Sequence, residues 1–236
     1  FNAVAAAQAA LIARWMAVGF VHGVMNTDNM AISGETIDYG PCAFMEAYAP
    51  GTVFSSIDRQ GRYAYANQPL ILGWNLARLA ETLLPLIDGD EDRAEAIATE
   101  ALAGIAPMYQ AEWLGQMRAK LGLLGAEDGD LALIEGFLAA MAGQGVDWTL
   151  GFRRLSGAVE DAAALRVLFD DAAALDAWLP RWRARLAAGA AGRMEAVNPL
   201  YIPRNHRVEE ALAAAHDGDM APFEALLSVI SDPFRV

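Results

Sequence analysis

Apolar positions recur at helical spacing along most of this chain. In residues 1 to about 20, they fall on one face of a predicted helix at Leu11, Ile12, Trp15, Met16 and Phe20. A second helix is predicted from Pro69, which suits a first helical turn, to Pro85 and the acidic turn at 88–90. The same spacing predicts helices at 91–105, 107–121, 130–142, 147–156, 160–168, 171–188 and 206–231, the last broken near Gly218. Asp147 is placed to cap the start of one of them.

Other stretches depart from this spacing. Met30-Ala31-Ile32 and Thr36-Ile37 are each too short for a helix, and Ser33-Gly34-Glu35 between them is typical of a tight turn, so we predict a small β-hairpin. Residues 41–68 carry few helical signals and are expected to be a loop with a short strand around 63–66. The predicted fold class is mainly α, and α+β overall.

Length limits the number of domains, and composition gives the net charge. With 236 residues and 25.2 kDa, the chain can form one large domain or two small ones. The segment Gly122 to Gly129 is predicted to be a linker, so we expect one domain at 1–121 and another at 122–236. The net charge of −13 repels nucleic acid and anionic lipid, and neither is an expected partner. A nucleotide would have to be bound by local positive groups and metal.

Cysteine content and apolar runs bear on the compartment. The single cysteine, Cys42, excludes an internal disulfide and suits a reducing compartment. We expect no membrane span, because Gln8 and Arg14 interrupt the first apolar run, and the start of the chain lacks the basic region of a signal peptide. The expected location is the cytoplasm. The oligomeric state is left open.

The predicted hairpin carries the candidate chemistry. Asn29 directly precedes its first strand and Asp38 directly follows its second, with Asp28 beside Asn29. Converging amide and carboxylate oxygens suit Mg²⁺, a hard cation that completes its shell with phosphate and water.

Kinase-like phosphotransferases use this layout: a loop that ends in a metal-binding Asn, a hairpin, and an Asp-aromatic-Gly triplet, here Asp38-Tyr39-Gly40. Where a kinase has His-x-Asp, this chain has His22-Gly23-Val24, and valine cannot accept a proton. Asp28 is then the available base. Val24 also disfavours a small-molecule kinase of the aminoglycoside phosphotransferase type.

The chain, with His22-Gly23-Val24 in place of the kinase His-x-Asp, resembles the selenoprotein O (SelO, also YdiU) family. The matching stretches are 22–30, 37–41, Gly61-Arg62-Tyr63-Ala64-Tyr65, Gln68-Pro69, 74–80, Asn198-Pro199 and Arg204-Asn205. The resemblance implies the C-terminal lobe of a protein-kinase-like fold with a short catalytic hairpin, followed by a helical C-terminal extension. It also implies transfer of AMP from ATP to Ser, Thr or Tyr hydroxyls of acceptor proteins, with Mg²⁺ or Mn²⁺. Asp28 would be the catalytic base, Asn29 and Asp38 the metal ligands, and Asp38 would also bind the nucleotide through the metal.

Several side chains allow two interpretations. His22 could be a ligand, but we expect it to anchor backbone by hydrogen bonding. Arg59, Arg62, Tyr63 and Tyr65 belong either to a surface loop or to a surface that positions phosphate or the acceptor protein. Cys42 is expected to pack, and a redox role near the site is the alternative.

In the second half, the expected core residues are Phe169, Trp178, Leu179 and Trp182. Arg181, Arg183 and Arg185 are expected to be solvated partners of nearby acids. Residues 198–206 are interpreted as a structural connector without a catalytic role.

A complete kinase-like nucleotide site also needs a Gly-rich loop and a strand-borne lysine. This sequence contains neither, and its single lysine is Lys120 in the helical part. We therefore expect the C-terminal part of a longer adenylyltransferase. The alternative is a non-catalytic helical interaction module or pseudokinase fragment.

Overall fold

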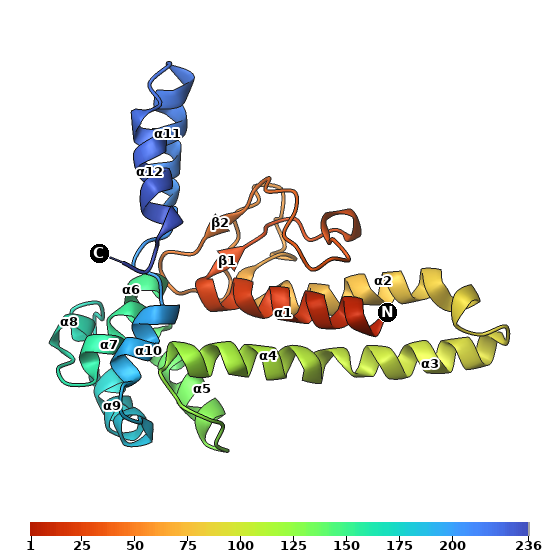
Figure 1. The fold of residues 1–236 in the computed structure, drawn as a ribbon, viewed down its shortest axis with the longest axis horizontal. Coiled ribbons are helices and arrows are strands. Elements are labelled where there is room, and N and C mark those ends of the chain that lie inside the picture. The colour runs from red at the N-terminus through yellow and green to blue at the C-terminus, as the bar shows by residue number, and fades with distance from the viewer. Residues whose placement is uncertain (236) are drawn as a thin grey trace. The chain divides into compact units, whose positions relative to one another are not determined.

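The computed structural model describes residues 1–235, and the chain is mainly helical as predicted (Figure 1). Its first part contains α1 (Asn2–Val18), β1 (Phe20–Val21), the 3₁₀ turn η1 (Thr27–Asn29), β2 (Ala43–Phe44), the 3₁₀ turn η2 (Tyr65–Asn67), α2 (Gln68–Ile87), α3 (Glu91–Ala103) and α4 (Ile105–Lys120). The remaining helices are α5 (Asp130–Met141), α6 (Trp148–Arg153), α7 (Leu155–Ala158), α8 (Ala163–Arg166), α9 (Ala173–Arg185), α10 (Ala190–Val197), α11 (Asn205–His216) and α12 (Ala221–Ser231). The only regular sheet within residues 1–235 pairs β1 with β2.

The chain forms two compact units. Unit 1 comprises Phe1–Ala43 and Pro50–Gln116, and unit 2 comprises Phe44–Ala49 and Met117–Val236. In unit 2 the short segment 44–49 is tied to the start of α6, since Tyr48 N–H donates to the Val146 carbonyl at 2.8 Å and Trp148 N–H donates to the Glu46 carbonyl at 2.7 Å. Segment 44–49 therefore packs with residues that follow it by about a hundred positions.

Unit 1 is organised around α1 and α2, which pack against each other. Leu11, Ile12, Trp15 and Met16 of α1 are buried, as the spacing predicted. Phe20 is also buried but lies in β1, because Gly19 ends the helix in a left-handed conformation, so its predicted place on the helix was wrong. α2 runs through Pro85 to Ile87, so the prediction that this proline ends the helix was wrong. Proline fixes φ near its helical value and removes only one bond in the last turn, which Asp88 then caps in extended conformation.

The membrane expectation also needs correction. The segment Tyr65–Ile87 is long and apolar enough to cross a bilayer by length and composition alone. Core helices of soluble proteins pass the same test, so this finding is weak evidence for a membrane span. In unit 1 this helix packs against α1 and α3.

Unit 2 has an aromatic core. Trp178 and Trp182 stack with ring centroids 5.2 Å apart, and Phe137 lies 4.8 Å from Trp178. The indole N–H groups are also satisfied, because Trp178 donates to the Leu133 carbonyl at 2.8 Å and Trp182 to the Leu121 carbonyl at 2.9 Å. Together with Phe169 and Leu179, both buried, this confirms the predicted core residues.

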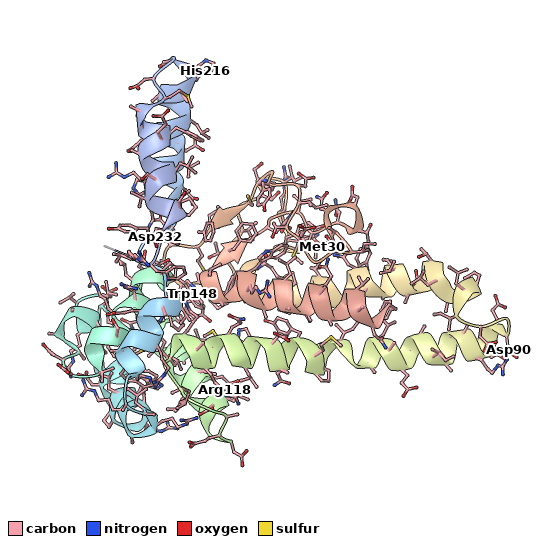
Figure 2. The ribbon with its side chains drawn as sticks, in the orientation of Figure 1. Met30, Asp90, Arg118, Trp148, His216 and Asp232 are labelled. Carbon is pink, nitrogen blue, oxygen red and sulfur yellow. The ribbon has the colours of Figure 1, made fainter. Side chains whose placement is uncertain are left out.

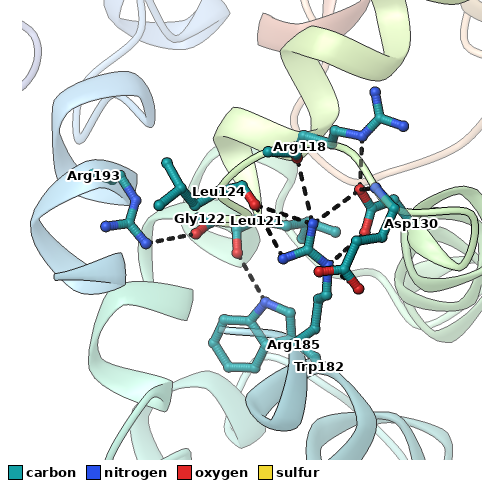
Figure 3. Close-up of polar contacts among 10 residues, drawn as sticks. Arg118, Leu121, Gly122, Leu124, Asp130, Trp182, Arg185 and Arg193 are labelled. Atoms are coloured by element: carbon teal, nitrogen blue, oxygen red, sulfur yellow. Dashed lines mark hydrogen bonds and ion pairs between the residues drawn. The ribbon is translucent and has the colours of Figure 1, made fainter. Parts of the chain in front are cut away.

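A buried carboxylate ties α4, α5 and α9 together within unit 2 (Figure 3). Asp130 is fully buried and accepts bonds from Arg118 at 2.8 Å, from Arg185 at 2.9 Å and from the Glu127 N–H at 2.9 Å. Burial alone would raise the pKa of Asp130, but the bonds from Arg185, the Glu127 N–H and Arg118 together lower it below its usual value. Arg181, Arg183 and Arg185 of α9 were expected to be solvated partners of nearby acids. For Arg185 this was wrong in part, since its partner is an acid but its side chain is only 11% exposed, and Arg183 instead donates to the Ala158 carbonyl.

The other predicted elements of unit 2 are shorter than expected. The helix at 147–156 is split into α6 and α7, and α10 was not predicted at all. Asp147 caps α6 as predicted, with its carboxylate accepting the Leu150 N–H at 2.7 Å. The break near Gly218 is also confirmed: Gly218 has φ 93°, and α11 and α12 lie side by side as a hairpin whose turn follows His216 (Figure 2).

The loop at 198–206 acts as a connector within unit 2. Asn198 is fully buried; its amide oxygen accepts from Lys120 Nζ and its amide nitrogen donates to the Lys120 carbonyl, both at 2.9 Å. Further along, Arg204 pairs with Asp147. These contacts are structural and support the connector interpretation.

Candidate functional site

The candidate site begins with the hairpin that follows η1. Met30 and Thr36 form one antiparallel bridge, and Gly34 N–H donates to the Ala31 carbonyl at 3.0 Å in the turn between them. The predicted turn is confirmed, but the strands reduce to this single bridge. Gly34 has φ 77°, and a Cβ there would lie 2.8 Å from Ala7 Cβ, so glycine is needed both for the turn and for close packing on α1.

His22 anchors the loop before η1. Its side chain is fully buried and stacks on Trp15 with ring centroids 5.2 Å apart. Nδ1 accepts from the Val24 N–H at 3.4 Å, so Nε2 carries the proton and donates to the Ile37 carbonyl at 2.8 Å. His22 therefore joins the loop to the residue directly before Asp38, which confirms the predicted anchoring role.

Four further polar side chains hold the backbone between the last turns of α1 and η1, residues 16–26, and sequence reasoning gave them no such role. Gln68 donates to the Phe20 carbonyl at 2.9 Å and accepts from the His22 N–H at 3.0 Å. Asn75 donates to the Met25 carbonyl at 3.0 Å. The other two are Tyr65, whose hydroxyl donates to the Met16 carbonyl at 2.6 Å, and Tyr63, whose hydroxyl donates to Asn26. The available signal was the presence of Gln68 and Asn75 on the apolar face of α2, since a buried amide needs partners.

Asn29 and Asp28 lie in η1. The Asn29 amide nitrogen donates to the Val24 carbonyl at 3.0 Å, which fixes the amide and leaves its oxygen as the available acceptor. Asp28 is exposed.

Asp38 lies two residues after the bridged Thr36. It has φ 55°, the only positive φ at a non-glycine position within residues 1–235, and its carbonyl accepts the Gly40 N–H at 2.9 Å. Such conformations are strained and recur at functional sites. Neither Asp28 nor Asp38 forms an ion pair or side-chain hydrogen bond in the part of the chain that the structure describes, so both carboxylates are free to bind a ligand.

These residues fit a substrate-completed magnesium site. Within residues 1–235, no three His, Cys, Asp or Glu side chains are grouped so that they could hold a metal by themselves. Asn29 and Asp38 could supply two hard oxygen ligands, and Mg²⁺ typically takes one or two carboxylates and completes its shell with substrate phosphates and water.

The segment after the hairpin is largely irregular, as expected, but the short strand expected around 63–66 was wrong, because residues 62–63 form a turn and η2 begins at Tyr65. The Asp58 carboxylate accepts the N–H groups of Arg62 and Tyr63 at 2.9 and 2.8 Å, and the Arg62 guanidinium lies 4.8 Å from the Trp74 ring centroid. Arg62 is thus a partner of Trp74 in this structure. Burial raises the pKa of the Cys42 thiol, which lowers its reactivity at neutral pH and favours the packing role.

A histidine-anchored loop, an oriented amide and two exposed carboxylates around a hairpin define a candidate divalent-metal and nucleotide site. Comparison with known proteins gives the family: the chain belongs to the SelO family, whose model, described as protein adenylyltransferase SelO, matches residues 1–231. The chain is 69% identical over 234 residues to a protein nucleotidyltransferase YdiU of Cereibacter sphaeroides, covering 99% of this chain and 49% of that protein. A protein nucleotidyltransferase YdiU of Rhizobium etli is 57% identical over 245 residues, covering 100% of this chain and 49% of that protein. The chain spans about half the length of the curated relatives it matches.

Proposed function

We propose that a full-length protein containing this chain transfers AMP from ATP to Ser, Thr or Tyr hydroxyls of acceptor proteins. The observation that carries the proposal is the pair of ties between η1 and Asp38: the His22 bond to the Ile37 carbonyl and the Met30–Thr36 bridge. They join the segments that carry all three candidate residues. The family name supports nucleotidyl transfer.

In this proposal unit 1 corresponds to a kinase-like C-terminal lobe. Asn29 and Asp38 would hold Mg²⁺ or Mn²⁺, which would offset the negative charge of the triphosphate. Asp28 accepts the proton of the acceptor hydroxyl while the hydroxyl oxygen forms a bond to the α-phosphorus of ATP. The bond from the α-phosphorus to the oxygen that bridges it to the β-phosphorus breaks, and pyrophosphate leaves. Val24 accounts for the use of Asp28, since no carboxylate stands at the usual kinase position.

The partners in this proposal are ATP and acceptor proteins, and the net charge of −13 argues against nucleic acid. We also propose a cytoplasmic location, which fits ATP as substrate and the free thiol of Cys42.

Labelled ATP tests the reaction type. We suggest a chimera in which this chain replaces the matching half of the full-length Cereibacter sphaeroides relative, to which it is 69% identical. With Mg²⁺ or Mn²⁺, label at the α-phosphate should appear on protein acceptors, and label at the γ-phosphate should not. Transfer of the γ-label alone would assign the protein to the kinases, and transfer of neither label by a folded chimera would contradict the proposal.

A further inference from the structure

Tyr63 links the segment after the hairpin to the loop that carries Asp28. Its hydroxyl donates to the side-chain oxygen of Asn26, which stands 37 positions earlier in the chain. Asn26 directly precedes η1, and its carbonyl accepts the Asn29 N–H at 3.0 Å, which closes this short turn just before Met30, labelled in Figure 2. The Asn26 side chain does not cap η1 itself. The start of η1 is therefore held by a tyrosine from outside the loop.

The two ends of η1 are held, and the position between them is not. At its end, the Asn29 amide nitrogen donates to the Val24 carbonyl at 3.0 Å. At its start, Asn26 accepts from Tyr63. Asp28 lies between these two bonds, is exposed, and forms no ion pair or side-chain hydrogen bond within residues 1–235. The direction of its carboxylate therefore follows the backbone of η1, and the Tyr63 bond helps to set that direction.

Tyr63 is itself fixed by a tight turn. The Asp58 carboxylate accepts the N–H groups of Arg62 and Tyr63 at 2.9 and 2.8 Å. Gly61 has φ 68°, a conformation that glycine adopts readily, and its carbonyl accepts from Asn67 Nδ2 at 2.7 Å. Asn67 directly precedes α2, so this turn is anchored at the start of a long helix. Because the backbone of the turn is already ordered, little further entropy is lost when the phenol is held in one place.

We propose that Tyr63 is a positioning residue that holds η1 so that Asp28 meets the acceptor hydroxyl; this inference rests on the proposed transfer of AMP. Tyr63 is half-buried and Asn26 is exposed, so water competes for their bond and its net contribution is modest. Loss of the bond should lower kcat about 10-fold, which corresponds to about 1.4 kcal/mol. The KM for ATP should change by less than about 2-fold, because the Asn29 amide keeps its own bond to Val24.

Three variants of the chimera test this coupling. Tyr63→Phe removes the donor, Asn26→Ala removes the acceptor, and the third variant combines both changes. Each single change should lower kcat for transfer of the α-label about 10-fold, and the double variant should be no slower than either, since the same bond is lost in all three. Tyr201→Phe is the matched control: it removes the hydroxyl of a tyrosine that is 37% exposed in unit 2, and it should keep the wild-type rate. A wild-type kcat for Tyr63→Phe, or losses that multiply in the double variant, would overturn the proposal.

Hydrogen exchange gives a measurement that needs no activity. In Tyr63→Phe the peptide that contains Asn29 should exchange several-fold faster than in the wild-type chimera, because the Asn29 N–H closes η1 onto Asn26. A peptide from α9 should exchange equally in both proteins, as should the Asn29 peptide in Tyr201→Phe. If the wild-type chimera transfers no AMP, the proposed function fails, while faster exchange at Asn29 still supports the hold of Tyr63 on η1. Unchanged exchange at Asn29 would overturn that hold, and if the chimera does not fold, the same comparison in this chain alone decides.

Discussion

At the scale of single residues, the candidate site depends on side chains whose orientation is fixed by backbone partners. Asn29 donates to the Val24 carbonyl and so presents its oxygen, and His22 holds Ile37 next to Asp38. Asp38 itself adopts a left-handed conformation at φ 55°, which Asp tolerates better than most residues. Neutral hydrogen bonds thus orient the Asn29 amide and hold the backbone directly before Asp38.

The carboxylates can be tested in the chimera. Asp28→Asn and Asp38→Asn should each lower the rate of AMP transfer by about 100-fold or more, because each removes an interaction of several kcal/mol in the transition state. Glu35→Gln is the matched control, since Glu35 is exposed in the same hairpin and bonds only to Ser33 within the described residues. The rate should be measured with α-labelled ATP. A near-normal rate for Asp38→Asn with Mg²⁺ or Mn²⁺ present would remove Asp38 from the proposed metal site.

Lys120 gives a residue-scale prediction for unit 2. It is 4% exposed, and desolvation by burial lowers its pKa from 10.5 to about 7, although Asn198 at 2.9 Å and the Phe152 ring at 4.2 Å offset part of this cost. In the unfolded chain the ammonium keeps its proton up to about pH 10.4. Between about pH 7 and 10 the unfolded state therefore binds more protons, and the free energy of unfolding should rise with pH by up to about 1.4 kcal/mol per unit.

This dependence should be measured by urea unfolding at several pH values. Lys120→Met is the comparison, because it keeps the length of the side chain and removes the titrating group. The difference in unfolding free energy between wild type and variant should change across this window and be constant below pH 6. A difference independent of pH from 6 to 10 would show that Lys120 keeps its charge in the folded state.

At the scale of elements, most helices could be predicted from the sequence because they are long enough to show apolar positions at helical spacing. α1, α3, α4, α5 and α9 lie within a few residues of their predicted positions. The short helices α6 to α8 and α10 were harder, since four to eight residues contain too few turns for a periodic signal. α2 passes through Pro85 because proline fixes φ near its helical value and removes only one backbone bond, in the last turn.

Part of the candidate site could be predicted because residues adjacent in the sequence specify its hairpin. Turn residues fix the position of the hairpin locally, so Asn29, Asp38 and the role of His22 could be read from adjacent positions. Gln68 and Asn75 reach the loop from about fifty positions away. No local pattern gives the partner of a distant amide, so their function as clamps required the structure.

The Asp130 cluster provides a prediction for the packing of α4, α5 and α9. Asp130→Asn should lower the free energy of unfolding by about 3 kcal/mol or more, because it leaves Arg118 and Arg185 with a neutral partner in a buried site. Asp176→Asn is the matched control: its pair with Arg166 is about half exposed on both sides, and the expected loss is below about 1 kcal/mol. Chemical denaturation checks both. Equal losses would show that burial of Asp130 does not strengthen these ion pairs.

At the scale of the whole molecule, several cationic groups that could bind a triphosphate already have other partners. The single lysine, Lys120, belongs to unit 2, where it is buried against Asn198. In unit 1, Arg62 lies on Trp74 and Arg78 pairs with Glu81. The net charge of −13 adds general repulsion. For the proposed ATP substrate, we expect most groups that bind the phosphates to come from the half of the relatives that this chain does not span.

The last prediction follows from this distribution of charge. The chain by itself should fold as a helical protein, bind Mg²⁺-ATP with a dissociation constant weaker than about 1 mM, which corresponds to roughly −4 kcal/mol, and transfer no AMP. Asn29 and Asp38 can hold the ion, but the phosphates then lack opposing positive groups and remain in contact with water, which screens the interaction. Titration calorimetry of the purified chain with Mg²⁺-ATP measures the affinity, and the chimera under the same conditions should bind at least ten times more tightly. A micromolar dissociation constant for the chain alone, with transfer of α-label, would show that these 236 residues contain a complete active site.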